Sequence, residues 1–176
     1  MKHKIGVIGS AKGKMNEELV SKARDIGREI ARHDCFLLTG AGMGLPYEAV
    51  LGAKEVGGFT VGFSPASNKV EHIERYKFPV ENFDIIVYTG FDYRGRIIPF
   101  IKSSDAIIGI SGGKGTLSEY STALAEDKIT GVLIGSGGIS DIIKEIENAC
   151  ENKKGGIFYN TDPKTLVKEV VESLNK

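Results

Sequence analysis

The chain has 176 residues, and its 23 basic and 23 acidic side chains leave no formal net charge at pH 7. This length is usual for a single domain, and we expect residues 1–176 to form one. Because the charges cancel and no run of like charge occurs, the composition argues against a nucleic-acid or membrane-surface partner and favours a small molecule.

Cysteine usage and the N-terminal residues point to the cytoplasm. Cys35 and Cys150 are too few for a disulfide framework or a zinc cluster. Lys2 and Lys4 lead into an apolar run that is too short for the core of a signal peptide, and no span of about 18 apolar residues occurs. We therefore predict a cytoplasmic protein.

Strand and helix patterns alternate along the whole sequence. Short apolar runs, most of which stop at glycine, predict strands at 4–9, 35–39, 59–63, 84–88, 105–110, 130–135 and 157–160. Helical spacing predicts helices at 16–33, 44–57, 93–103, 114–127, 139–150 and 162–175. The stretch 64–82, with Pro65 and Pro79, is too polar for the core and is either a lid or a connector.

The composition of the strands predicts the fold class. Residues 107–110 and 132–134 are nearly continuous apolar runs, which is typical of strands buried on both faces of a parallel sheet. The sequence therefore predicts an α/β fold: a doubly wound, mostly parallel sheet of about seven strands with helices on both faces.

Four glycine-rich turns follow predicted strands, at 9–14, 40–44, 111–116 and 135–138. Any one of them can be ordinary tight-turn chemistry. Four on one edge of a parallel sheet favour a phosphate site, because helix N-termini offer unpaired N–H groups there. The predicted phosphate-binding residues are Gly9, Ser10, Gly40, Gly42, Gly44, Gly112, Gly113, Gly115 and Thr116.

Two common nucleotide motifs do not fit these turns. A Walker loop needs four residues between its first glycine and Gly-Lys, whereas Gly9–Lys14 and Gly109–Lys114 have too short a spacing and lack the following Ser or Thr. The dinucleotide fingerprint needs an acidic residue near the end of the second strand, which here ends at Thr39. An ATPase and an NAD-dependent enzyme are both disfavoured, and no resident cofactor is predicted.

Residues 111–119, Ser-Gly-Gly-Lys-Gly-Thr-Leu-Ser-Glu, resemble the Pro-Gly-Gly-x-Gly-Thr-x-x-Glu motif of the LOG (LONELY GUY) family of Rossmann-like proteins. Gly9-Ser10 and residues 39–58 are similar to that family's first two glycine loops. The resemblance covers roughly residues 4–135. It implies hydrolysis of the N-glycosidic bond of a nucleoside 5′-monophosphate to free base and ribose 5-phosphate, by a homodimer.

The resemblance also assigns individual residues. It places Arg96 at the arginine of the family's Arg-Lys pair and Glu119 at the motif glutamate, both as catalytic residues. Two positions depart from the family, because Ile97 replaces the lysine and Ser111 replaces the motif's proline. A related molybdenum-cofactor carrier binds a phosphorylated pterin on a similar scaffold without hydrolysis, so a non-catalytic carrier is the alternative function.

Each catalytic candidate has a competing structural interpretation. Glu119 can stabilise an oxocarbenium-like ribose, or can form a capping box with Thr116 at the start of a helix. Arg96 can hold the phosphate or the base, with Arg94 as an alternative, or can form a surface ion pair.

The remaining basic residues carry weaker signals. Lys12, Lys14 and Lys114 lie in glycine turns and can contact phosphate, although exposed loop lysines usually have no such role. The three histidines, His3, His33 and His72, do not have metal-ligand spacing. They are predicted to be solvated or structural, and no metal site is expected.

Overall fold

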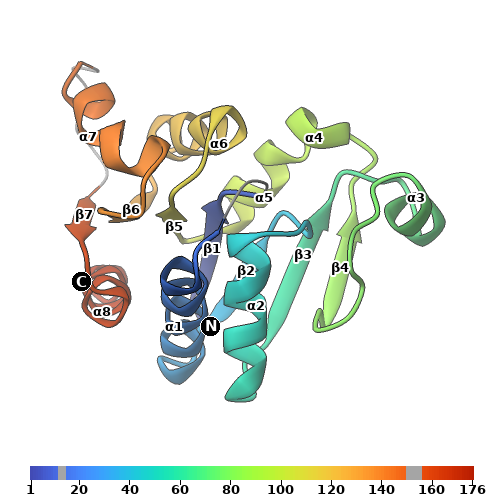
Figure 1. Ribbon diagram of the computed structural model, residues 1–176, viewed down its shortest axis with the longest axis horizontal. Coiled ribbons are helices and arrows are strands. Elements are labelled where there is room, and N and C mark those ends of the chain that lie inside the picture. The colour runs from blue at the N-terminus through green and yellow to red at the C-terminus, as the bar shows by residue number, and fades with distance from the viewer. Residues whose placement is uncertain (12–14, 150–155) are drawn as a thin grey trace.

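The computed structural model describes residues 1–11, 15–149 and 156–176. Within these ranges the strands form one seven-stranded parallel sheet of order β4-β3-β2-β1-β5-β6-β7 (Figure 1). The strands are β1 (Lys4–Gly9), β2 (Phe36–Thr39), β3 (Thr60–Ser64), β4 (Ile85–Tyr88), β5 (Ala106–Ile110), β6 (Ile129–Leu133) and β7 (Ile157–Asn160). The predicted doubly wound α/β fold is confirmed.

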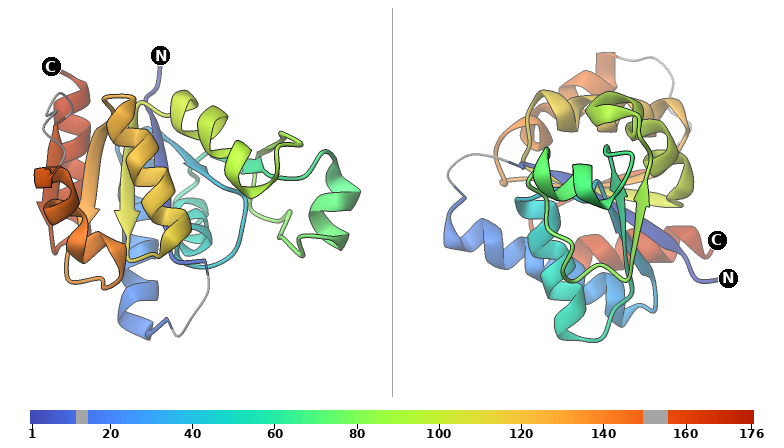
Figure 2. Two further views of the ribbon diagram at one scale, coloured as in Figure 1. Left: turned by 90° about the horizontal axis from the view of Figure 1, so that it is seen from above. Right: turned by 90° about the vertical axis from the view of Figure 1, so that its right-hand side faces the viewer.

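Helices cover both faces of this sheet, as Figure 2 shows. The helices are α1 (Glu17–Arg32), α2 (Leu45–Glu55), α3 (Lys69–Glu74), α4 (Asp92–Gly95), α5 (Ile97–Ser103), α6 (Lys114–Ala125), α7 (Ile139–Ala149) and α8 (Pro163–Leu174). Helices α1, α2 and α8 bury their apolar side chains in one core. Helices α5, α6 and α7 do so in a second core on the opposite face. No helix in the described ranges is long and apolar enough to cross a membrane.

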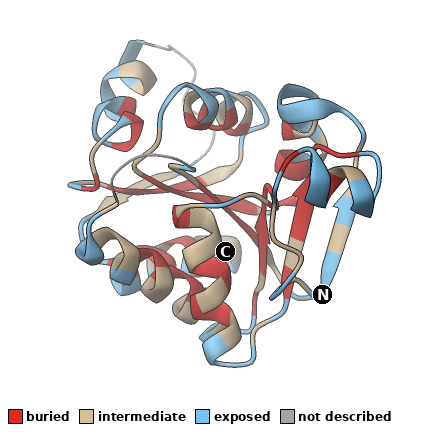
Figure 3. Ribbon diagram, turned by 45° about the vertical axis from the view of Figure 1, so that its right-hand side comes forward, coloured by how far each residue is buried: buried red, intermediate tan, exposed pale blue. Residues whose placement is uncertain are grey.

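The central strands are buried and the outer strand β4 is not (Figure 3). All five residues of β5 are buried, in agreement with its continuous apolar sequence. In β4, exposed residues alternate with half-buried ones, because β4 forms one edge of the sheet. The chain order changes direction between β1 and β5, and in sheets of this type ligands bind outside the carboxyl ends of the strands at that point.

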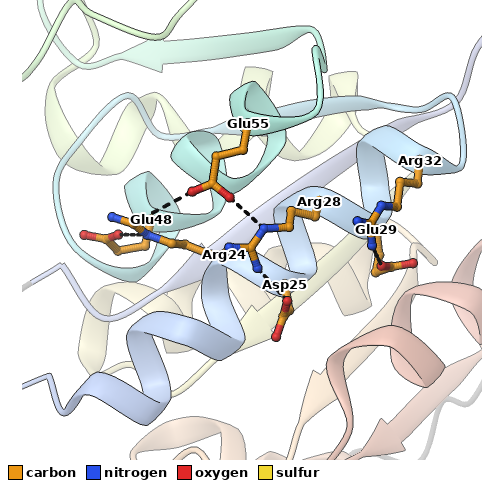
Figure 4. Close-up of polar contacts among 7 residues, drawn as sticks. All are labelled: Arg24, Asp25, Arg28, Glu29, Arg32, Glu48 and Glu55. Carbon is orange, nitrogen blue, oxygen red and sulfur yellow. Dashed lines mark hydrogen bonds and ion pairs between the residues drawn. The ribbon is translucent and has the colours of Figure 1, made fainter.

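Helices α1 and α2 approach so closely that two glycines are required at their contact. A Cβ added at Gly27 would lie 1.8 Å from the Ala49 carbonyl oxygen, and one at Gly52 would lie 2.1 Å from the Arg24 carbonyl oxygen. Ion pairs join the same two helices at the surface, where Arg24 contacts Glu48 at 2.9 Å and both Arg24 and Arg28 contact Glu55 (Figure 4). This contact fixes the two helices that follow β1 and β2.

Two predicted segments differ from the structure. Residues 64–82 are not irregular throughout, because they contain α3, where His72 is fully buried. The helix predicted at 93–103 is divided into α4 and α5, which meet at Arg96. Pro99 explains the division, since it is tolerated in the first turn of α5 but would disrupt the interior of one continuous helix. Cys35 is buried as a free thiol, and Cys150 lies outside the described residues.

Candidate functional site

A cavity of about 460 Å³ opens at the carboxyl edge of β1, β2 and β5. This volume is in the range of small-molecule sites. The cavity is lined by Val7, Ile8, Gly9, Ser10, Ala11, Gly40, Gly42, Met43, Pro46, Phe78, Tyr93, Arg96, Gly113, Lys114, Gly115, Thr116 and Glu119. Nine of the eleven predicted site residues are therefore brought together, and Gly44 and Gly112 are not among the lining residues.

Gly44 and Gly112 shape the turns next to the cavity. Both have positive φ, +86° and +103°, a conformation that glycine adopts without steric cost. A Cβ at Gly44 would lie 2.3 Å from the Ser10 carbonyl oxygen, and one at Gly112 would lie 2.4 Å from Thr116 Oγ1. Gly44 lets the turn after β2 approach the turn after β1, and Gly112 makes room for Thr116 within its own turn.

Packing within the protein also explains three of the lining glycines. A Cβ at Gly9 would meet the Ile110 carbonyl oxygen at 2.4 Å, and one at Gly40 would meet the Arg96 guanidinium at 1.8 Å. At Gly42 the Phe78 ring is 3.2 Å away. Gly9 thus allows close contact with the backbone of β5, and Gly40 and Gly42 allow close contact with the Arg96 and Phe78 side chains.

Gly115 has no comparable explanation within the described residues. A Cβ added there would find no atom within 4 Å, although glycine in a helix costs about 1 kcal/mol relative to alanine. Gly113, which precedes the helix, also faces open space. Both glycines line the cavity, so the start of α6 leaves room for a ligand to approach the backbone.

The alternative interpretation, a capping box, is wrong, because α6 begins three residues earlier than a box formed by Thr116 and Glu119 requires. The N-cap is Gly113, and no side chain of the described residues caps this helix end. Thr116 lies in the first turn, where its Oγ1 donates a hydrogen bond to the Gly9 carbonyl oxygen at 3.1 Å. An uncapped helix start has unpaired N–H groups and a partial positive charge, which together favour an anion.

Arg96 and Glu119 form a buried pair in the cavity wall. Their side chains are 13% and 11% exposed, and Arg96 Nη2 lies 3.8 Å from Glu119 Oε1. Arg96 Nη1 donates to the Phe63 carbonyl oxygen at 3.1 Å, while its buried Nε has no partner among the described residues. A buried donor without a partner is costly, so this guanidinium has capacity for one more acceptor.

Burial controls the protonation of this pair. It raises the pKa of Glu119 to about 7, and the charge of Arg96 opposes that shift without cancelling it. Burial likewise lowers the pKa of Arg96, against the attraction of Glu119. Both shifts disfavour the charged forms, which is consistent with the separation of 3.8 Å. The Glu119 carboxyl can therefore hold or release a proton near neutral pH.

The backbone conformation at residue 111 explains why Ser111 stands where the LOG motif has proline. Its φ is +57°, which proline cannot adopt, and its N–H donates to Ser136 Oγ at 2.7 Å. Ser140 Oγ donates to the Ser111 carbonyl oxygen at 2.8 Å, and Ile139 N–H donates to the Gly112 carbonyl oxygen at 2.9 Å. The turn at 135–138 thus supports the turn at 111–116 from outside the cavity.

The other positions considered for a cation differ in whether they line the cavity. Ile97, at the position of the family's lysine, is buried in the core on the α5 side and supplies no cation. Arg94 is exposed and does not line the cavity, whereas Lys114 does. Lys12 and Lys14 lie outside the described residues.

Three large lining side chains were not predicted from the sequence. Met43 lies in the second glycine turn, Phe78 in the stretch 64–82, and Tyr93 in α4. No motif marks them. The only available signal for these residues was the group of aromatic residues near Phe78 in the sequence, and those aromatic residues have no fixed spacing that would mark a site.

Comparison with known proteins identifies the family. The family model described as SLOG cluster4 matches residues 2–167. The chain belongs to the SLOG cluster4 family. This membership places the chain in the Rossmann-like SLOG/LOG-type superfamily, in agreement with the resemblance to LOG proteins at the level of the superfamily.

SLOG cluster4 membership is accompanied by similarity over most of the chain. An uncharacterized protein of Archaeoglobus fulgidus is 35% identical over 125 residues, which are 70% of this chain and 75% of that one. The molybdenum cofactor binding protein of Rippkaea orientalis is 28% identical with a TM-score of 0.82, covering 100% of this chain and 99% of that one. The molybdenum cofactor carrier protein of Chlamydomonas reinhardtii is 26% identical with a TM-score of 0.78, and both chains are covered completely.

Proposed function

We propose that the protein binds a small phosphorylated ligand in this cavity, with the phosphate at the start of α6. The observation that carries the proposal is Gly115, a helical glycine with open space beside it at an uncapped helix start. Lys114 also lines the cavity and adds a cation there. Backbone N–H groups, helix dipole and ammonium all favour the same anionic group.

The first candidate is a carrier of a phosphorylated cofactor of the pterin type. Two similar structures are named as molybdenum cofactor proteins and align over essentially the whole chain. The lysine of the LOG family's Arg-Lys pair is replaced here by the buried Ile97, so one cation of the LOG hydrolase site is missing. Arg96 lines the cavity, and its guanidinium can donate to an acceptor on such a ligand.

The second candidate is hydrolysis of a nucleoside 5′-monophosphate, and Glu119 is the observation that favours it. In this reaction water adds to C1′ of the ribose as the bond to the base nitrogen breaks, and the base leaves with a proton. A carboxylate beside C1′ stabilises the positive charge that develops on the sugar. The pKa of about 7 would leave Glu119 partly ionised at neutral pH.

One experiment separates the two candidates. The protein is incubated with AMP and other nucleoside monophosphates, free base is measured by chromatography, and thermal protection is measured in parallel. Protection without base supports the carrier, whereas release of base and ribose 5-phosphate supports the hydrolase. If no phosphorylated compound protects the protein or is cleaved, the proposal is wrong.

A lysine pair provides a control for the location of the phosphate. We expect Lys114→Ala to weaken the binding of AMP several-fold, because an exposed ammonium that contacts phosphate contributes a modest attraction. Lys164 stands near the start of α8, whose N-cap Asp162 already accepts from Thr165 N–H. Lys164→Ala should therefore leave the binding of AMP unchanged.

A further inference from the structure

The end of the cavity nearest β4 is an aromatic wall. Phe78 and Tyr93 line it, with ring centroids 6.1 Å apart and ring planes at 79°. Tyr76 contacts both rings, at 5.7 Å from Phe78 and 5.2 Å from Tyr93. Tyr93 is about half exposed, so the wall presents ring surface that the protein itself does not cover.

The two ends of the cavity differ in chemistry because of the strand order. The start of α6 follows β5 inside the sheet, whereas Phe78 and Tyr93 lie on segments that flank the edge strand β4, four positions away in the strand order. Gly42 lies between them, with the edge of the Phe78 ring 3.2 Å from the position of its absent Cβ. A ligand with its phosphate at α6 therefore extends toward aromatic surface.

Two polar contacts hold Phe78 in this wall, and the first is made by a buried histidine. His72 is fully buried, with Nδ1 2.8 Å from Ser64 Oγ and Nε2 donating to the Pro79 carbonyl oxygen at 2.9 Å. Ser64 Oγ accepts from Ala66 N–H at 3.1 Å, so its own proton is directed to Nδ1. His72 thus ties the backbone next to Phe78 to the end of β3.

The second contact lies on the other side of the wall. Tyr76 donates its hydroxyl proton to Asp92 at 2.5 Å, which joins the segment after α3 to α4. His72 also packs edge-on against Phe78, with centroids 5.7 Å apart. The stretch 64–82 is therefore a fixed part of the cavity, with Phe78 held between two anchors.

We propose that Phe78 and Tyr93 form a subsite for the planar ring of the phosphorylated ligand, and that His72 is the positioning residue that keeps Phe78 in it. This inference rests on the proposed function, because it assumes that the phosphate occupies the start of α6. It adds that a ring system, and not the sugar or phosphate alone, is recognised. Every heteroaromatic base has a π-face, so the wall suits pterins and purines alike.

The test compares two probes that differ only in the ring. Dissociation constants for AMP and ribose 5-phosphate are measured by titration calorimetry for wild type, Phe78→Leu, His72→Leu and His72→Gln, with chromatography to verify that AMP is intact. We expect Phe78→Leu and His72→Leu to weaken the binding of AMP by about tenfold and the binding of ribose 5-phosphate by less than about twofold. His72→Gln should recover part of the loss, since its amide can still donate to Pro79.

Two further variants keep the result decisive. Phe59→Leu removes an exposed ring that packs on Phe36 away from the cavity, and it should change neither constant. If His72→Leu does not fold, Ser64→Ala removes one of its two anchors and should lower the preference for AMP in the same direction. Equal losses for AMP and ribose 5-phosphate would overturn the ring subsite alone, whereas a wild type that binds neither probe would overturn the proposed function as well.

Discussion

Glu119→Gln should change how the stability of the protein depends on pH. The carboxyl has a pKa near 4.5 when unfolded and about 7 when folded. Because the folded-state pKa is raised, protonated Glu119 contributes stability that is present in full below about pH 4.5 and is lost as the pH rises through about 7. Glutamine has the same shape and stays neutral at every pH.

The size of the effect follows from this shift. One pKa unit corresponds to about 1.4 kcal/mol, so between pH 5 and pH 8 wild type should lose about 2 kcal/mol that the variant retains. The assay is urea unfolding of both proteins at several pH values in this range. The quantity compared is the difference in unfolding free energy between variant and wild type, in which the other titrating groups cancel.

We expect this difference to move in favour of Glu119→Gln as the pH rises. Glu172, which is exposed on α8, provides the control, and Glu172→Gln should show no such trend. A difference that stays constant would refute the argument that burial controls this carboxyl. A trend in the opposite direction would show that Arg96 stabilises the carboxylate by more than burial costs.

Four further outcomes can be measured directly. Gly115→Ala should raise the free energy of unfolding, measured in urea, by about 1 kcal/mol. The same variant should bind AMP about tenfold more weakly, because the new methyl group occupies the approach to the helix start. Unchanged affinity for AMP would exclude a ligand there. Gly27→Ala should cost about 3 kcal/mol in the same unfolding assay, because α1 and α2 must separate to admit the methyl group, and a loss under 1 kcal/mol would contradict the close contact. Light scattering at micromolar concentration should give a homodimer, as the LOG resemblance implies, and a monomer alone would remove that proposal. A fluorescent single-stranded oligonucleotide should not bind at physiological salt, given zero net charge, and salt-sensitive binding would contradict the expected small-molecule partner.

Much of the fold was predictable because its signals are local. The short apolar runs, most of which end in glycine, marked each strand to within one or two residues, and continuous apolar sequence at 107–110 indicated burial on both faces. In a parallel sheet the carboxyl ends of the strands meet at one edge. The turns at 9–14, 40–44 and 111–116 could therefore be assigned to one site from the sequence alone.

The unpredicted features depend on contacts between distant residues. Thr116 and Glu119 have the spacing of a capping box, but Thr116 lies inside the first turn of the helix and its hydroxyl bonds to Gly9, which is remote in sequence. The burial of His72 depends on Ser64 and Pro79 closing around it. Local patterns do not encode such contacts, so the stretch 64–82 could not be recognised as a wall of the cavity.

The most direct test of the proposed site is a crystal structure of the protein with AMP or with a ligand that remains bound through purification. We expect the phosphate at the N-terminus of α6, within hydrogen-bond distance of backbone N–H groups in Gly113–Thr116, and the ring toward Phe78. Density for the phosphate away from the turns after β1, β2 and β5 would contradict this expectation.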